Sequence, residues 1–130
     1  MNSARFTILV AEDEDEMRDF VGGALCGQGY DVLEATDGAA ALDLATRHNG
    51  PIHLLLTDIS MPGLSGWELY RRLSSARPGT ATLFMSHNFN SSLRQYAPFL
   101  PKPFEISDLL TKVCYALKRS PASKISQRTM

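Results

Sequence analysis

The sequence lacks the features that mark secreted, membrane and nucleic-acid-binding proteins. Its two cysteines are too few for a disulfide scaffold. No apolar stretch approaches the roughly 20 residues of a membrane span, and the amino terminus lacks the charged and then apolar pattern of a signal peptide. The formal net charge of −1 leaves no basic surplus to displace counterions from phosphates. We therefore expect a soluble cytoplasmic protein that contacts neither a membrane nor nucleic acid directly.

What the sequence does contain is typical of one globular domain. With 130 residues, the chain can bury roughly two thirds of its unfolded surface. Apolar runs alternate with helical patterns five times, which predicts a doubly wound α/β fold with a five-stranded parallel sheet. The predicted strands cover about residues 6–11, 30–35, 52–57, 81–85 and 97–100.

The helical patterns predict which residues face the sheet. Asp37 is predicted to cap the second helix. The last helix has the clearest pattern, with apolar residues at spacings of three and four. Cys26 and Cys114 fall on apolar faces of two predicted helices, so we expect both to be buried free thiols. The apolar positions of the last helix are Ile106, Leu109, Leu110, Val113, Cys114 and Leu117.

Charged and polar residues stand where four of the predicted strands end. Glu12 and Asp13 end the first strand, Asp58 the third, Ser86 the fourth and Lys102 the fifth. In a right-handed parallel sheet these carboxyl ends lie at one edge, so the side chains converge. Such an acidic site with one cationic arm can hold a divalent metal and receive a phosphoryl group. The next acidic residues, Glu14, Asp15 and Glu16, are interpreted as a solvated helix start.

This order of residues resembles the receiver (response-regulator) domain of two-component signalling over about residues 5–118. The resemblance rests on the five strand-end positions and on two segments, Leu-Leu-Thr-Asp-Ile-Ser-Met-Pro-Gly-Leu-Ser-Gly and Phe-Leu-Pro-Lys-Pro-Phe. It implies a flavodoxin-like sheet with strand order 2-1-3-4-5. We expect a receiver domain over residues 1–119 and a polar, disordered tail over residues 120–130.

The resemblance also implies a role for each residue of the site. Asp58 would accept a phosphoryl group from a phosphohistidine on a sensor histidine kinase or a histidine phosphotransfer protein. Asp13, Asp58 and the backbone carbonyl of Ser60 would ligate Mg²⁺, and Glu12 would act through a bound water. Lys102 would pair with a phosphate oxygen.

Switching would depend on residues beside the phosphate. The resemblance implies that the Ser86 hydroxyl swings toward the phosphoryl group and that Phe99 then moves into the space it leaves. His87 departs from the family pattern, which has Ala or Gly there, and we expect it to cover the mouth of the site. Asn88 and Ser60 are further positions expected to modulate access.

The connection between the fourth and fifth strands is a second departure from the family. Only residues 87–96 are available for it, near the ~10–12 residue minimum for a parallel crossover. The fourth helix must therefore be shortened to one or two turns at most, or be irregular. In this family that helix is part of the face that signals to partner proteins, so its shortening leaves the partner of this chain unassigned.

Three functions fit these observations. The leading one is a single-domain response regulator, a phosphoryl acceptor rather than an enzyme, with at most slow self-dephosphorylation. Because no effector region follows, it would bind a downstream protein or pass the phosphoryl group on, and the initiating Met and polar tail favour a complete chain. The first alternative is a degenerate receiver that serves as a constitutive docking module. The second is a haloacid-dehalogenase-like phosphatase with Asp13 as nucleophile, but the short chain and the setting of Asp58 argue against it.

Overall fold

Five parallel strands form a single sheet in the computed structural model, which describes residues 5–88 and 91–119. The strand order is β2-β1-β3-β4-β5, so both the predicted fold class and the predicted order are confirmed. The strands begin and end within two residues of the predicted positions. They are β1 (Thr7–Ala11), β2 (Asp31–Ala35), β3 (Leu54–Asp58), β4 (Ala81–Ser86) and β5 (Phe99–Pro101).

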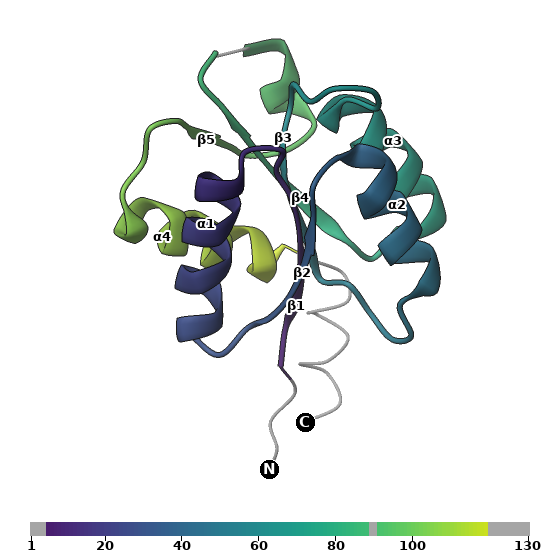
Figure 1. Cartoon of the computed structure of the whole chain (residues 1–130), viewed down its shortest axis with the longest axis horizontal. Coiled ribbons are helices and arrows are strands. Elements are labelled where there is room, and N and C mark those ends of the chain that lie inside the picture. Colours follow the sequence, from purple (N-terminus) through teal and green to yellow (C-terminus); the bar gives the residue numbers. More distant parts are fainter. Residues whose placement is uncertain (1–4, 89–90, 120–130) are drawn as a thin grey trace.

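Helices cover both faces of this sheet, as Figure 1 shows. Helices α1 (Asp15–Gly27) and α4 (Ile106–Lys118) lie on one face, and α2 (Gly38–Arg47) and α3 (Gly66–Ala76) lie on the other. Asp37 caps α2 as predicted, because its Oδ1 accepts the backbone N–H of Ala40 at 2.8 Å. Helices on both sides bury the central strands completely, which explains why these strands are almost continuous apolar runs.

The core is divided by the sheet into two layers. Alternate residues of β1 point to opposite faces, so Ile8 and Val10 pack toward α1 and α4 while Leu9 and Ala11 pack toward α2 and α3. All four side chains are fully buried. This packing fixes the register of the strands, because a slip by one residue would exchange the two sets.

In the described part of the connection between β4 and β5, the one helical element is a 3₁₀ helix, η1 (Ser91–Gln95), so the prediction of a shortened fourth helix is confirmed. Strand β5 is short as well and pairs with β4 only from Phe84 to Ser86. Among the described residues, no strand pairs with residues 81–83 of β4 at this edge of the sheet, although Thr82 and Leu83 are buried.

The prediction of burial was wrong for both cysteines and for one residue of the last helix. Cys26 and Cys114 are exposed, and Ile106 is 47% exposed. Each helix buries only the stripe that faces the sheet, and Val113 already occupies that stripe in α4. Its neighbour Cys114 is turned about 100° away, because an α-helix has 3.6 residues per turn. The tail predicted for residues 120–130 lies outside the described residues.

A buried imidazole stands at the opposite end of the sheet from the predicted site. His53 is 3% exposed, its Nδ1 accepts the backbone N–H of Thr7 at 3.0 Å, and its ring meets Phe6 edge-on. Nδ1 can accept only in the neutral imidazole. Burial lowers the pKa of His53 below its ordinary value of 6.5, because the charged form would lose its hydration.

This lowered pKa predicts a loss of stability in weak acid. The unfolded chain binds a proton at His53 below a pH of about 6.5 and the folded chain only at lower pH, so the free energy of unfolding falls as pH drops through that window. His53→Asn keeps an acceptor for Thr7 but cannot titrate. Urea unfolding is measured at pH values of about 7.5, 6.5 and 5.5, which bracket this window. The free energy of unfolding should change less steeply with pH in the variant than in the wild type. If the free energy of unfolding depends equally on pH in both proteins, protonation of His53 does not contribute to that dependence.

Candidate functional site

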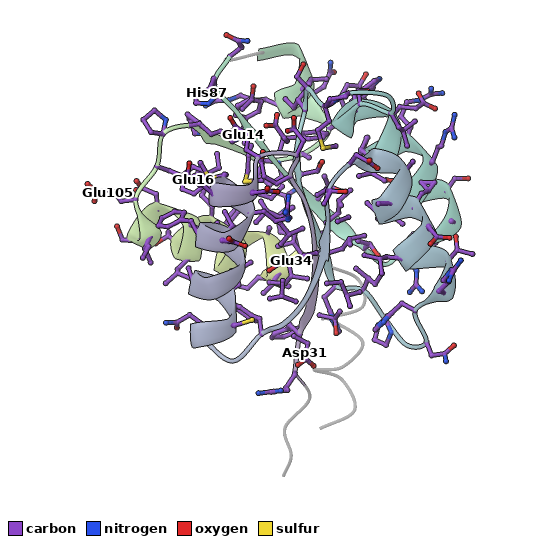
Figure 2. All side chains as sticks on the ribbon, viewed as in Figure 1. Glu14, Glu16, Asp31, Glu34, His87 and Glu105 are labelled. Carbon is purple, nitrogen blue, oxygen red and sulfur yellow. The ribbon has the colours of Figure 1, made fainter. Side chains whose placement is uncertain are left out.

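The strand-end residues meet in one cleft at the carboxyl edge of the sheet. Figure 2 shows Glu14 and His87 at this end of the molecule and Asp31, at the start of β2, at the opposite end. The cleft has a volume of about 210 Å³. Its lining residues are Asp13, Glu14, Asp58, Ser60, Ser86, His87 and Asn88.

Three carboxylates lie close enough to share one cation. Glu12, Asp13 and Asp58 each offer an oxygen, and these oxygens lie within 4.8 Å of one another. Glu12 is fully buried and Asp58 is 9% exposed, whereas Asp13 is exposed to solvent. A set of hard oxygen ligands with open positions suits Mg²⁺, which keeps several waters when bound by carboxylates. The residues present therefore fit the predicted metal.

The ammonium group of Lys102 joins two of these carboxylates. Its Nζ donates to Asp58 Oδ2 at 2.7 Å and to Glu12 Oε1 at 2.8 Å, and the Lys102 side chain is completely buried. A carboxylate oxygen of Glu14 lies 4.0 Å from the same nitrogen. Buried charges require such partners, because an unpaired ion inside a protein costs several kcal/mol.

The buried ion pairs shift the pKa values of two of these groups. Burial raises the pKa of Glu12 above its ordinary value, although hydrogen bonds from Lys102 and from the backbone N–H of Glu14 oppose the shift. For Lys102, burial alone would lower the pKa, but the hydrogen bonds to Asp58 and Glu12 outweigh it and the pKa is raised. The lysine is thus held firmly in its charged form.

Local backbone contacts fix the orientation of the Asp58 side chain. Its Oδ1 accepts the backbone N–H of Ser60 at 3.1 Å. The backbone after Asp58 is tied to β4, because the N–H of Ile59 donates to the carbonyl of Met85 at 3.2 Å. The carboxylate is therefore held at both oxygens, by a backbone amide on one side and by the ammonium group of Lys102 on the other.

Two glycines allow the loop after Asp58 to fold back on itself. Gly63 has a φ of 76°, a conformation that side chains disfavour. Gly66 begins α3, and its N–H donates to the carbonyl of Ile59 at 2.7 Å. A Cβ atom added at Gly66 would overlap the backbone carbonyl oxygen of Asp58. The close approach of α3 to the end of β3 therefore requires glycine at this position.

The remaining predicted residues lie around the cleft in different environments. Ser86 is buried, and its Oγ accepts the backbone N–H of Asn88 at 3.0 Å. His87 is exposed and lines the cleft. Phe99 does not line the cleft: it is 3% exposed and packs in a separate cluster with Phe84.

Glu14 is the lining residue that the sequence interpretation missed. It was assigned to a solvated helix start, and it is indeed the N-cap residue of α1 and exposed. It nevertheless borders the cleft, because α1 begins directly above the end of β1. Its position immediately after Asp13 was the available signal.

Comparison with known proteins identifies the class to which this cleft belongs. The family profile of the response regulator receiver domain matches residues 8–114. The response regulator receiver protein CpdR of Brucella abortus is 37% identical over 112 residues, which are 82% of this chain and 92% of that protein. The sensor kinase CckA of the same organism is 34% identical over 125 residues, but the chain spans only 13% of its length.

Solved structures agree with the sequence comparison. The receiver domain of the hybrid histidine kinase CckA has a TM-score of 0.76 and 36% identity, over 85% of this chain and 98% of that one. A CheY-like receiver domain protein from Methanospirillum hungatei has a TM-score of 0.80 and 26% identity, over 89% and 96%.

The chain belongs to the response regulator receiver domain family. This membership confirms the resemblance seen in the sequence and, with it, the phosphoryl-accepting response regulator as the function class. Neither the comparisons nor the fold favour the docking-module or phosphatase alternatives. Among the described residues, no helix is both long and apolar enough to cross a membrane.

The close contact between Gly66 and Asp58 predicts that a side chain added at Gly66 disturbs the cleft, whereas one added at an open glycine does not. Gly66→Ala should push the Asp58 loop away from α3 and lower the free energy of unfolding by about 1–3 kcal/mol, the usual cost of overpacking. Gly23→Ala is the matched control, because nothing lies within 4 Å of a Cβ at that position. It should stabilise α1 by roughly 0.5–1 kcal/mol. Urea unfolding measures both changes, and equal effects would contradict the close approach.

Proposed function

We propose that Asp58 is the residue that accepts the phosphoryl group. The observation that carries this proposal is the position of its carboxylate, which lines the cleft between two other acidic groups and a buried ammonium group. In the transfer, a carboxylate oxygen of Asp58 attacks phosphorus and the phosphorus–nitrogen bond of the donor phosphohistidine breaks. An acyl phosphate forms, and the imidazole of the donor leaves with a proton.

The acidic cluster is proposed to hold Mg²⁺ during this reaction. Asp13, Asp58 and the backbone carbonyl of Ser60 would be its protein ligands, and the bound ion would neutralise charge on the phosphoryl oxygens. Glu12 is proposed to act through water. This fits its environment, because both its carboxylate oxygens already accept hydrogen bonds, from Lys102 and from the backbone N–H of Glu14.

Lys102 is proposed to bind the transferred group. Its ammonium group contacts the acceptor carboxylate directly, so it needs to move very little to reach a phosphoryl oxygen on Asp58. The terminal oxygens of the phosphoryl group carry negative charge and are stronger acceptors than the bridging oxygen of the acyl phosphate. The contact with Glu12 can persist and keep the lysine aligned.

The neighbouring residues are proposed to sense the new charge. Ser86 stands at the end of β4 and lines the cleft, so its hydroxyl can donate to the phosphoryl group. Phe99 of β5 is proposed to respond to that motion through Phe84, its pairing partner in β4, which lies two residues before Ser86. His87, Asn88 and Ser60 are proposed to control access, since all three line the cleft.

The partners follow from this chemistry. A sensor histidine kinase or a histidine phosphotransfer protein would supply the phosphoryl group, and a downstream protein would read the switched state. We place the protein in the cytoplasm and assign residues 1–119 to the receiver domain, in keeping with the elements described between Thr7 and Lys118. The chain would act as a phosphoryl acceptor with at most slow self-dephosphorylation.

The acceptor can be identified by replacing single carboxylates. Asp58→Asn should abolish labelling by acetyl phosphate with Mg²⁺, because the amide cannot act as the nucleophile. Asp15→Asn is the control: Asp15 has an 83% exposed side chain paired with Arg18 at 2.6 Å, outside the cleft. Peptide mapping by mass spectrometry should place the phosphoryl group on Asp58 in this control. Labelling that survives in Asp58→Asn and disappears in Asp13→Asn would favour the phosphatase-like mechanism instead.

Metal affinity gives a separate test of the acidic cluster. Asp13→Ala should weaken Mg²⁺ binding by about tenfold or more, ~1.4 kcal/mol, because it removes an exposed direct ligand. Glu12→Gln should weaken it less, because that contact runs through water. Calorimetry measures both affinities, with and without a beryllofluoride phosphoryl mimic, which should tighten binding. An unchanged affinity in Asp13→Ala would remove this residue from the metal site.

A further inference from the structure

A largely buried arginine lies behind the acidic cleft. Arg18 is in the first turn of α1, and its side chain is only 13% exposed although it is charged. It does not line the cleft. Arginine is seldom buried to this extent unless its charge is paired. The groups that the guanidinium contacts therefore indicate what this residue does.

The guanidinium of Arg18 contacts three different elements. Its Nη1 donates to the backbone carbonyl of Glu12, directly after β1, at 2.9 Å. Its Nη2 donates to Asp15 Oδ1 at 2.6 Å, and its Nε lies 3.9 Å from a carboxylate oxygen of Glu34 in β2. Because a guanidinium presents its N–H groups in a rigid planar fork, these contacts together fix its position.

A glycine of α1 makes room for the contact with β2. A Cβ atom added at Gly22 would overlap the carboxylate of Glu34. At Gly23, the next residue, nothing lies within 4 Å of an added Cβ atom. Glycine at position 22 therefore lets the Glu34 side chain lie against α1, where it supports the guanidinium of Arg18 from the side of β2.

The contact that bears on the cleft is the one with the Glu12 carbonyl. This carbonyl and the N–H of Asp13 belong to one planar peptide unit. The N–H of Glu12 is already tied to β2, because it donates to the carbonyl of Ala35 at 3.1 Å. Arg18 holds the other side of the Glu12 backbone, and with it the direction in which the chain continues to Asp13.

Asp13 depends on this support more than the other two carboxylates of the cleft. The carboxylates of Glu12 and Asp58 are held by the ammonium group of Lys102. Asp13 is exposed to solvent, so packing does not fix its side chain. The position of its carboxylate is therefore set mainly by the backbone that carries it.

We propose that Arg18 is a positioning residue for the metal site. Its hydrogen bond to the Glu12 carbonyl orients the peptide unit that leads to Asp13, and so places the Asp13 carboxylate for Mg²⁺. The inference rests on the metal site proposed above. Arg18 itself touches neither the ion nor the phosphoryl group. Groups that hold a metal ligand from behind commonly change metal affinity by about 10–100-fold when they are removed.

The sign of the change in Mg²⁺ affinity separates positioning from a simple effect of charge. Arg18 is a cation behind a site for a cation, so the loss of its charge alone would relieve repulsion and tighten Mg²⁺ binding. The loss of its hydrogen bond to Glu12 would weaken Mg²⁺ binding, because Asp13 would no longer be held in one direction. We expect the second effect to be the larger.

Two substitutions at Arg18 test this expectation by calorimetry of Mg²⁺ binding. Arg18→Met removes the charge and the donors, and it should weaken Mg²⁺ binding about tenfold, ~1.4 kcal/mol. Arg18→Lys keeps the charge but replaces the fork with a single ammonium group, so it should weaken binding at least about threefold. If Arg18→Met does not fold, Arg18→Lys decides the question by itself.

Two control variants remove related contacts without touching the Glu12 carbonyl. Arg71→Met breaks an ion pair of the same spacing, with Glu68 at 3.1 Å, on α3 and outside the cleft. Asp15→Asn removes the exposed partner of Arg18 and leaves the Glu12 contact in place. Both should change Mg²⁺ affinity less than about twofold, as expected for exposed ion pairs. Urea unfolding of every variant separates a loss of stability from a loss of affinity.

The amide resonance of Asp13 gives a readout that needs no metal. Its nitrogen shares a peptide unit with the Glu12 carbonyl, so Arg18→Lys should shift this resonance in the NMR spectrum of the metal-free protein, and Arg71→Met should not. Three results would overturn the inference alone: unchanged Mg²⁺ affinity in Arg18→Lys, unchanged or tighter binding in Arg18→Met, or an Asp13 resonance that does not move. A wild type that binds no Mg²⁺ would contradict the proposed metal site as well.

Discussion

The buried ion pairs of Lys102 are the interaction on which the cleft depends. One ammonium group contacts Asp58 and Glu12, and its own side chain is completely buried. These three residues come from the ends of β5, β3 and β1, so the pairing is possible only when the strands are in register. Burial also removes the competing hydration of the charges, which makes each contact stronger than a surface ion pair and makes a missing partner costly. Correct pairing of the strands therefore brings the site together, and the ion pairs of the site stabilise that pairing.

The general plan of the fold could be predicted from the sequence because its strands are buried on both faces. Continuous apolar runs locate such strands directly, and a strand that ends on a charged residue shows where the sheet meets solvent. This reasoning placed Asp58 and Lys102 at one edge of the sheet. It could not predict which oxygens Lys102 would contact, since that depends on side-chain rotamers. Nor could it predict that Cys114 is exposed, because a shift of one residue on a helix exchanges a buried position for a solvated one.

A compact aromatic cluster packs beside the carboxyl end of β3. Phe84 and Phe99 form its buried centre, and Trp67 and Tyr70 of α3 pack against them. Ile59, which immediately follows Asp58, packs against the same cluster, and the ring of Tyr96 contacts Trp67 edge-on. A tightly packed cluster moves between discrete arrangements rather than deforming gradually. Packed side chains thus connect the backbone after Asp58 with β4, β5 and α3, although none of the cluster's residues lines the cleft.

The charge of the cleft decides which ligands it can attract. In the cleft, Glu12, Asp13, Glu14 and Asp58 carry four negative charges against the single positive charge of Lys102, which leaves a formal charge of −3. An anionic phosphoryl donor would be repelled by that charge, so the cleft can receive it only when a divalent cation balances the excess. The whole chain has a formal net charge of only −1, so this acidic excess is concentrated in the cleft and is largely balanced by basic residues elsewhere in the sequence.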